Sequence, residues 1–198
     1  MAMRPFFGTQ TIGGTNPQPV FGTSVTTAFA PPPDPYSGNL APGSNETLVT
    51  IVVASTKGFW QGDNVLIGPA ASFKPGIVAP GSIADFGTVK SVVDATHLIV
   101  QGLKKAHAAA DWVVLDQPAG NIHIRPVVTA STVYIGNAST LSATDLSLMD
   151  ELPITAAGAA PGYVFDAESI GMSQPFSTAD FWIFGTAADT FLARYTTI

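Results

Sequence analysis

The sequence predicts a mainly β protein in three parts: an extended N-terminal arm over residues 1–45, a small β-barrel over 46–129 and a C-terminal antiparallel β-sandwich over 130–198. Two observations predict this class. Glycine and proline recur along the chain, at 19 and 16 of 198 residues, and short apolar runs rich in β-branched residues lie between them. Such a composition favours short strands joined by tight turns over long helices.

The arm is rich in Pro, Gly, Thr and Asn, and the stretch from Ala30 to Asn45 has four prolines within five positions. Because proline fixes φ at about −65° and has no N–H to donate, this stretch is expected to be extended. Large apolar residues between the prolines should bury against the chain's own domain or against a neighbouring subunit. The candidate assembly contacts are Phe6, Phe7, Phe21, Phe29 and Tyr36.

The next part fits a five- or six-strand meander that closes into a small barrel. Residues 94–96 form a turn-sized polar break between two of its strands. Residues 70–81 fit a loop, and Lys104 to Asp111 fits a single helical turn. The expected strands cover residues 46–56, 64–67, 86–93, 97–103, 112–115 and 121–128.

The last part contains five segments, of which four are strand-like. The exception, Ser142 to Leu152, fits a short helix or an irregular loop. For the helix, Ser142 and Asp145 resemble a capping box, Leu148 and Leu152 share one helical face, and Pro153 ends the run.

The charge balance argues against nucleic acid as a partner. The formal net charge is −6, the isoelectric point is about 4.7, and the eight Lys and Arg residues are scattered. Zero cysteines exclude disulfides, thiolate metal sites and cysteine nucleophiles. The sequence shows no signal-peptide pattern and no apolar run of the roughly 20 residues that cross a bilayer, so no membrane partner is expected.

Only 11% of the residues are charged. Charge keeps exposed surfaces apart, so a chain poor in charge and rich in Ala, Thr, Gly and Val is expected to bury surface in an assembly. We therefore expect a homo-oligomer or repeated subunit contacts, with a thermally robust monomer as the alternative.

The sequence has no Rossmann, P-loop, zinc-protease or nucleophile-elbow motif, and we expect no catalytic, cofactor-binding or metal-binding residues. His123 alternates with Asn121 and Arg125, which predicts one exposed sheet face rather than a site. The densest acidic group, at Asp145 and residues 150–151, could serve glycoside hydrolysis or bind a divalent cation. Helix capping and solvation are the favoured interpretation of this group.

Aromatic residues offer one further possibility. Their rings could form a platform on which sugars stack, because an aromatic face binds apolar ring surfaces while polar tips stay wet. Core packing is the favoured interpretation, since these residues lie in strands or beside glycines. They are Trp60, Trp112, Trp182, Tyr134 and Tyr163.

Four segments of the last part carry a resemblance. They run Thr132-Val-Tyr-Ile-Gly-Asn137, Pro161-Gly-Tyr-Val-Phe-Asp-Ala-Glu168, Phe181-Trp-Ile-Phe-Gly-Thr186 and Phe191 to Tyr195. Together they resemble a β-sandwich module that recurs in structural proteins of tailed-bacteriophage particles, whose last two strands form a hairpin. The resemblance covers roughly the last third of the chain, and the insertion from Leu141 to Pro153 departs from the shorter typical loop.

What the resemblance implies is a non-enzymatic virion protein that decorates and stabilises a capsid, as a cement protein does. The implied partners are the major capsid protein and copies of the chain itself, on the capsid exterior after assembly in the host cytoplasm. The alternatives are a neck or tail accessory protein, or an adhesin that binds host glycan through exposed Trp60 and Trp182. A glycan hydrolase that uses Asp145 and Asp150 ranks third.

Overall fold

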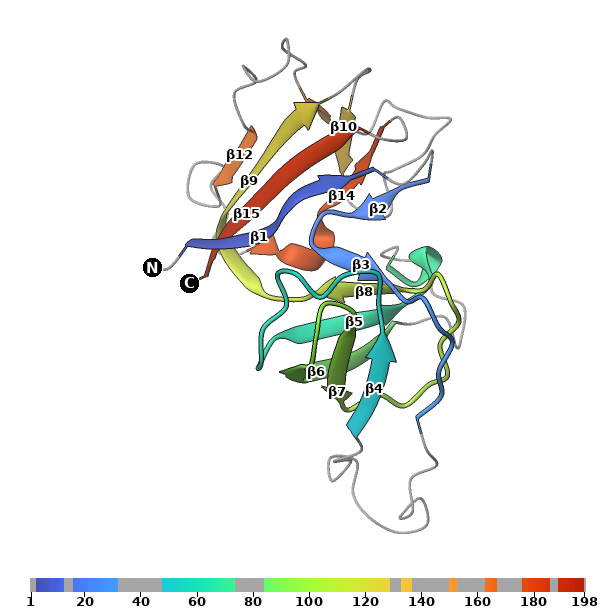
Figure 1. The fold of residues 1–198 in the computed structure, drawn as a ribbon. Helices are drawn as coiled ribbons and strands as arrows, with labels where there is room; N and C mark the ends of the chain where they lie inside the picture. The colour runs from blue at the N-terminus through green and yellow to red at the C-terminus, as the bar shows by residue number, and fades with distance from the viewer. Residues whose placement is uncertain are drawn as a thin grey trace.

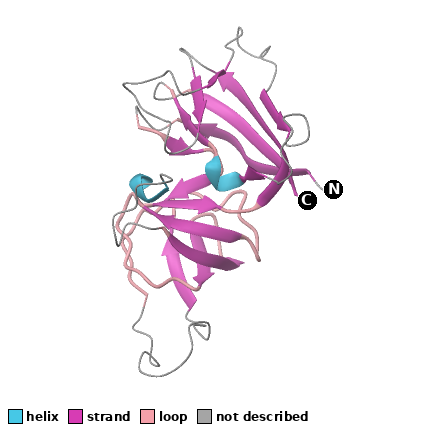
Figure 2. Ribbon diagram, turned by 180° about the vertical axis from the view of Figure 1, so that it is seen from behind, coloured by secondary structure: helices cyan, strands magenta, loops and turns pink. Residues whose placement is uncertain are grey.

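The computed structural model describes residues 3–12, 16–31, 48–73, 84–128, 133–136, 150–152, 163–166, 176–185 and 189–197. The chain is mainly β, as predicted, and forms two β units that stack end to end (Figure 1). Helix in the described part is limited to two short 3-10 turns, η1 (Ala70–Phe73) and η2 (Thr178–Asp180), both near the junction of the units (Figure 2).

The upper unit in Figure 1 is an antiparallel sandwich of two sheets. The first and last strands of the described chain pair with each other in the first sheet. The order in that sheet is β1 (Met3–Thr11), β15 (Thr190–Thr197), β9 (Pro118–Val128) and β12 (Tyr163–Asp166), with β13 (Phe176–Ser177) also paired to β9. The order in the second sheet is β11 (Asp150–Leu152), β10 (Val133–Gly136), β14 (Trp182–Phe184) and β2 (Gln18–Pro19).

Alternation along the strands builds the core of the sandwich. Successive side chains of a strand point to opposite faces, and buried residues accordingly alternate with less buried ones over 121–125 of β9 and 190–196 of β15. The buried side chains of the sandwich core include Ile122, Ile124, Phe191, Ala193 and Tyr195 from the first sheet and Val133, Ile135 and Ile183 from the second. The sandwich part of the fold prediction is therefore confirmed.

The lower unit is a six-stranded antiparallel sheet that curls into a barrel. Its order is β3 (Gly22–Ser24), β8 (Trp112–Leu115), β5 (Asn64–Gly68), β6 (Asp85–Val92), β7 (His97–Gln101) and β4 (Leu48–Val52). The two edge strands meet just beyond their ends, where Val25 and Val53 form an antiparallel bridge. The N–H of Ala54 donates to the carbonyl of Ser24 at 2.9 Å beside this bridge. This contact joins the edges, as the predicted barrel requires.

Two local predictions for the barrel are wrong. The strand over 121–128 was expected to close it, but β9 pairs with β15 and β12 of the sandwich. The barrel is closed instead by β3, from the N-terminal segment, whose partner β8 lies about 90 positions away in sequence. Residues 104–111 form no helical turn, because the backbone of His107 exchanges two hydrogen bonds with that of Phe29, at 2.8 and 3.0 Å.

Two predictions for the sandwich also need correction. Residues 150–152 form strand β11 against β10, so the end of the segment proposed as a helix or loop is a strand; residues 142–149 lie outside the described part. The closing hairpin that the resemblance implies is absent, because β14 and β15 belong to different sheets. The chain crosses the sandwich between these two strands.

The described parts of the predicted arm pair within the chain itself. Strand β1 joins one sandwich sheet, β2 joins the other, and β3 joins the barrel. Ile12, Val20 and Val25 are buried in the chain's own core. These side chains therefore pack against the chain's own domains and not against a neighbouring subunit. Removing residues 1–45 would take strands from all three sheets.

The passage from β2 to β3 needs a glycine. A Cβ built on Gly22 would lie 2.6 Å from Cγ of Pro19 and 2.9 Å from the carbonyl oxygen of Val113. The chain crosses from the sandwich to the barrel here, and the backbones approach too closely for a side chain.

The hairpin between β6 and β7 is held by Asp94, in the turn that the sequence predicted. Its carboxylate accepts hydrogen bonds from the backbone N–H groups of Thr96 at 2.7 Å and His97 at 2.9 Å. Nδ1 of the His97 ring also lies 2.9 Å from Oδ1 of Asp94. The N–H of Thr96, followed by the His97 ring, lowers the pKa of Asp94 from 3.8 to about 2.

We expect Asp94→Ala to lower the melting temperature near neutral pH. A carboxyl whose pKa is lower in the folded chain stabilises above its unfolded pKa of 3.8, and this contribution is lost as pH falls toward 2. Thermal melts of wild type and variant across this range should therefore converge at the acid end. A constant gap at all pH values would show that the charge of Asp94 plays no part.

Candidate functional site

The five predicted assembly contacts fall in different environments. Phe21 is fully buried and packs edge to face on Tyr195, with ring centroids 5.5 Å apart, so it offers no surface to a neighbour. Phe29 is partly buried against the barrel core and lies 5.1 Å from the ring of His107. Phe6 and Phe7 are residues of β1, and their side chains lie outside the described part. Tyr36 lies outside the described residues altogether.

The tryptophans separate into three environments. Trp182 is 1% exposed, in a cluster where the outer face of the barrel meets the sandwich, so the adhesin platform of Trp60 with Trp182 does not form. Trp112 is half-buried and packs edge to face on Trp182, with centroids 6.4 Å apart. Trp60 is 55% exposed, so the core interpretation is wrong for this residue. Tyr134 is half-buried beside Phe184; the side chain of Tyr163 is outside the described part.

His123 lies where the sequence predicted, on the outer face of the first sandwich sheet. Asn121, His123 and Arg125 are half-buried, while Ile122 and Ile124 between them point into the core. The predicted acidic group at residues 145–151 lies outside the described part, because Asp145 and the side chains of residues 150–151 are not described.

Sequence reasoning missed a buried cluster of Asp85, His107 and Asp111 at one end of the barrel. Nδ1 of His107 lies 3.1 Å from Oδ2 of Asp111, and Nε2 lies 3.5 Å from Oδ2 of Asp85. The backbone N–H groups of Lys104 and Lys105 donate to Asp85 at 2.5 and 2.9 Å. The three residues lie in two separate segments, so their spacing gives no motif from which the cluster could be read.

The cluster ties the segment 104–111 to β6. Burial would raise the pKa of Asp85, but His107 and the two backbone N–H groups outweigh it, so the pKa is lowered from 3.8. Nε2 of His107 is buried without a hydrogen-bond partner. The described side-chain contacts of the cluster run within the barrel unit, and we assign it a structural role.

Large exposed hydrophobic side chains gather on the barrel. Every one in the described part lies there: Leu48, Trp60, Phe86, Val92 and Val93. Leu48 of β4 pairs with Gln101 of β7, which pairs in turn with Thr88 of β6. Phe86 lies two positions before Thr88, so Leu48 and Phe86 lie at the same end of the barrel. We call these two residues, 58% and 51% exposed, the lower apolar spot.

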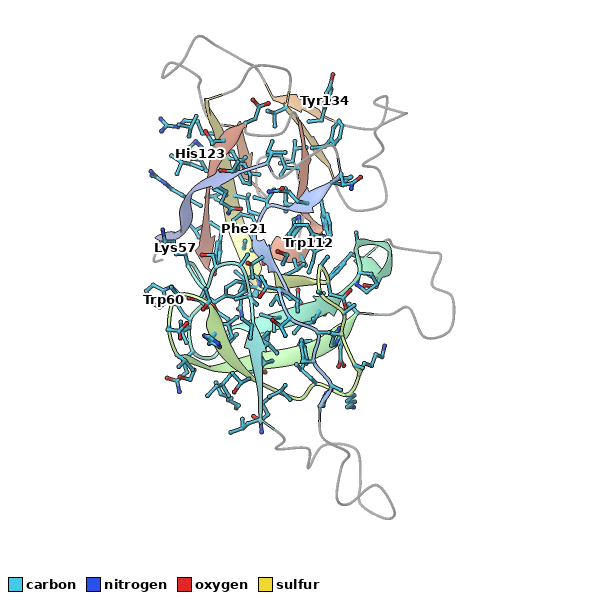
Figure 3. The ribbon with its side chains drawn as sticks, turned by 45° about the vertical axis from the view of Figure 1, so that its right-hand side comes forward. Phe21, Lys57, Trp60, Trp112, His123 and Tyr134 are labelled. Atoms are coloured by element: carbon cyan, nitrogen blue, oxygen red, sulfur yellow. The ribbon has the colours of Figure 1, made fainter. Side chains whose placement is uncertain are left out.

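The upper apolar spot consists of Trp60, Val92 and Val93, at the other end of β6. The N–H of Gly62 donates to the carbonyl of Val89 at 2.8 Å, and this hydrogen bond holds the turn of Trp60 along β6. The N–H of Trp60 donates to Oδ2 of Asp63 at 2.7 Å, so the turn that presents the ring is itself ordered. The ring thus lies exposed on a fixed support (Figure 3).

Two arginines lie on the outer face of the first sandwich sheet. Arg194 of β15 pairs in register with His123, and Leu192, two positions earlier, pairs with Arg125. Neither guanidinium has an ion pair or hydrogen bond among the described contacts. Burial, followed by the charges of Arg194 and Arg125, lowers the pKa of His123. Two of the eight Lys and Arg residues of the chain therefore lie close together on this face, beside His123.

An open cleft of about 500 Å³ lies at the junction of the two units. Segments distant in sequence line it: the end of β1, strands β2 and β3, the turn after β4, and the start of β8. Most of the lining side chains are polar, and Trp112 is the aromatic among them. Figure 3 places Lys57, Phe21 and Trp112 at the level of this junction.

Within the described ranges, no group of three or more His, Cys, Asp or Glu side chains is placed to hold a metal ion. The described helices are all too short to cross a bilayer. No family model, no curated protein and no solved structure matches the chain.

Proposed function

We propose that the chain is a non-enzymatic structural protein of a tailed-bacteriophage particle, which decorates the capsid by contacts between the outer surface of its barrel and capsid subunits. The gathering of large exposed hydrophobic side chains on the barrel is the observation that carries this proposal. Surface hydrophobic residues scattered singly need no explanation, but a gathered set is typical of a protein interface.

The geometry of the upper apolar spot fits a contact of this kind. Trp is enriched among the residues that dominate binding energy at interfaces. The turn that carries Trp60 is fixed by hydrogen bonds before any partner arrives, so little conformational entropy is lost when the ring is covered. The low charged fraction, 11%, also suits repeated subunit contacts.

Two further features support the proposal. The resemblance of residues 132–195 to phage β-sandwich modules is the reason for proposing a phage particle; β10, β12, β14 and β15 fall on the four matching segments, but β14 and β15 lie in different sheets and not in one hairpin. Arg125 and Arg194, which have no ion pair among the described residues, lie outside the barrel contact and would add long-range attraction to an acidic capsid surface. Copies of the chain itself remain candidate neighbours, since a shell repeats every contact by symmetry.

Copy number per particle tests this function. Purified virions of the phage that encodes the chain would be measured by quantitative mass spectrometry, with the major capsid protein as internal reference. We expect a count on the order of hundreds, because icosahedral symmetry multiplies each shell contact. About a dozen copies or fewer would support a neck or tail position instead. Absence from the particle would refute the virion assignment.

Attachment variants test the surface. Particles that lack the chain would be mixed with purified Trp60→Ala or Leu48→Asp protein and sedimented. Both side chains are more than half exposed, so the variants should fold while binding falls at least about tenfold if the spots are buried in the contact. Asn16→Ala, an exposed change between β1 and β2 of the sandwich and away from the barrel, is the control and should bind as wild type. Equal binding by all variants would assign the contact to another face.

A further inference from the structure

The cleft at the junction of the two units has the position and the volume of a ligand site, and it plays no part in the contacts proposed above. Pockets that bind small ligands lie preferentially where domains meet, and their volumes are about 300 to 1,000 Å³. The volume here, about 500 Å³, falls in that range. Because the barrel spots lie elsewhere, failure of the capsid proposal would leave the cleft untouched.

Several polar groups in the cleft are available to a ligand. The hydroxyls of Thr11 and Ser24 and the ammonium of Lys57 have no hydrogen bond or ion pair in the described part of the chain. Thr11 and Lys57 are exposed, so water solvates their polar groups when no protein partner is present. The Nε2 amide of Gln10 donates to the carbonyl of Val20 at 3.0 Å, which fixes that side chain at the cleft wall.

Trp112 supplies an apolar surface beside these polar groups. It packs against Trp182 on one side, in the cluster between the two units, and it lines the cleft on another. A ring held in this way presents a rigid, partly exposed surface at little entropic cost. An aromatic surface flanked by hydroxyl and amide groups suits a ligand with apolar C–H faces and many hydroxyls.

The backbone of the cleft is already paired, which argues against a peptide strand as the ligand. The carbonyl of Ser24 accepts the N–H of Ala54 at 2.9 Å, and the carbonyl of Thr11 accepts the Nε2 amide of Gln18 at 3.2 Å. A strand that adds to a sheet edge needs free backbone groups. The cleft can therefore form hydrogen bonds with a ligand through its side chains rather than through its backbone. Lys57 is the single cation in the lining, which is too little charge for a polyphosphate.

We propose that this cleft binds a short oligosaccharide that carries a carboxylate, with its ring against Trp112, its hydroxyls on Ser24 and Thr11, and its carboxylate on Lys57. The sugar hydroxyls exchange hydrogen bonds with the protein hydroxyls, and the ammonium forms a charge-assisted hydrogen bond with the carboxylate. The backbone around the cleft and the Trp112 ring are held by contacts within the chain, so the exposed side chains of Lys57 and Thr11 are the main groups that lose freedom on binding.

Amide chemical-shift titration of the full-length chain tests the site, with trigalacturonic acid as probe, a neutral galactose trisaccharide for comparison and triglutamate as the peptide competitor. We expect shifts at residues 22–24 and 54–57, with a Kd of about 1 mM or tighter. The neutral sugar should bind several-fold more weakly. No shifts, equal binding of the neutral sugar, or tighter binding of triglutamate would overturn the proposal.

Matched variants separate the roles of the cleft residues. Lys57→Met should weaken the binding of trigalacturonic acid about tenfold, which is the effect of one charge-assisted contact. The Kd of the neutral trisaccharide should change by less than about twofold. Ser24→Ala should weaken both sugars. Lys90→Met, an exposed lysine change outside the cleft, should change neither. Unchanged trigalacturonate affinity in Lys57→Met would refute the assignment of the carboxylate to Lys57. Phage-particle attachment should be unaffected by Lys57→Met and Ser24→Ala.

Discussion

Phe21→Ala is expected to destabilise the chain by about 3 to 5 kcal/mol, the usual cost of removing a buried phenyl ring. Phe21 has 0% exposure and packs edge to face on Tyr195 of β15. Its carbonyl also accepts the N–H of Leu115 at 2.8 Å, so the residue sits where the sandwich and the barrel share one core. A domain is stable by only about 5 to 15 kcal/mol, so this loss is a large fraction.

The measurement is urea denaturation followed by tryptophan fluorescence. Phe86→Ala is the matched control: the same residue change at 51% exposure, where the cost should stay near about 0.5 kcal/mol. Because the core is continuous, both units should unfold in one transition in wild type and in Phe21→Ala. Comparable losses in the two variants would contradict the buried position of Phe21.

Asp85→Ala is expected to cost about 3 kcal/mol, because it strips a buried cluster of one partner. The N–H groups of Lys104 and Lys105 would lose their acceptor, and Nε2 of His107 would lose the carboxylate 3.5 Å away. Asp85→Asn keeps an oxygen for the backbone donors and removes the charge, so its cost should be smaller. The same denaturation measurement near neutral pH ranks the three proteins.

The pH dependence adds a second readout. The pKa of Asp85 is lowered from its ordinary 3.8 in the folded chain, so the carboxylate stabilises above that value and its contribution is lost as pH falls through the lower, folded pKa. The gap in unfolding free energy between wild type and Asp85→Asn should narrow in that acid range. A gap that widens on acidification would mean that the carboxylate is not the stabilising form.

Much of the local structure was readable from the sequence because its causes are local. Strand β4 follows from a β-branched run, and the β6–β7 hairpin follows from a polar turn that begins with Asp94. The exposed face of His123 follows from period-two alternation along β9. Such signals depend on neighbours within a few residues, which the sequence displays directly.

The candidate sites were not readable in the same way. Trp60 and Trp182 each follow a phenylalanine in an apolar stretch, yet Trp60 is 55% exposed and Trp182 is 1% exposed. The difference arises because Trp182, from the sandwich, packs against the outer face of the barrel. The cleft and the buried cluster of Asp85, His107 and Asp111 draw side chains from segments far apart in the chain. Neither arrangement leaves a spacing that a motif could capture.

The sequence by itself determined the class: a mainly β chain of short strands, acidic and poor in charge, with a barrel and a sandwich in it. Tertiary structure alone decided which strand belongs to which unit. Strand β9 looks like the end of the barrel in sequence, but its pairing with β15 places it in the sandwich, while β3 from the N-terminal segment completes the barrel. The physical reason is that any strand of suitable alternation can pair with many others. The choice among them rests on which pairing buries the shared core, and that core includes residues from Ile12 to Tyr195.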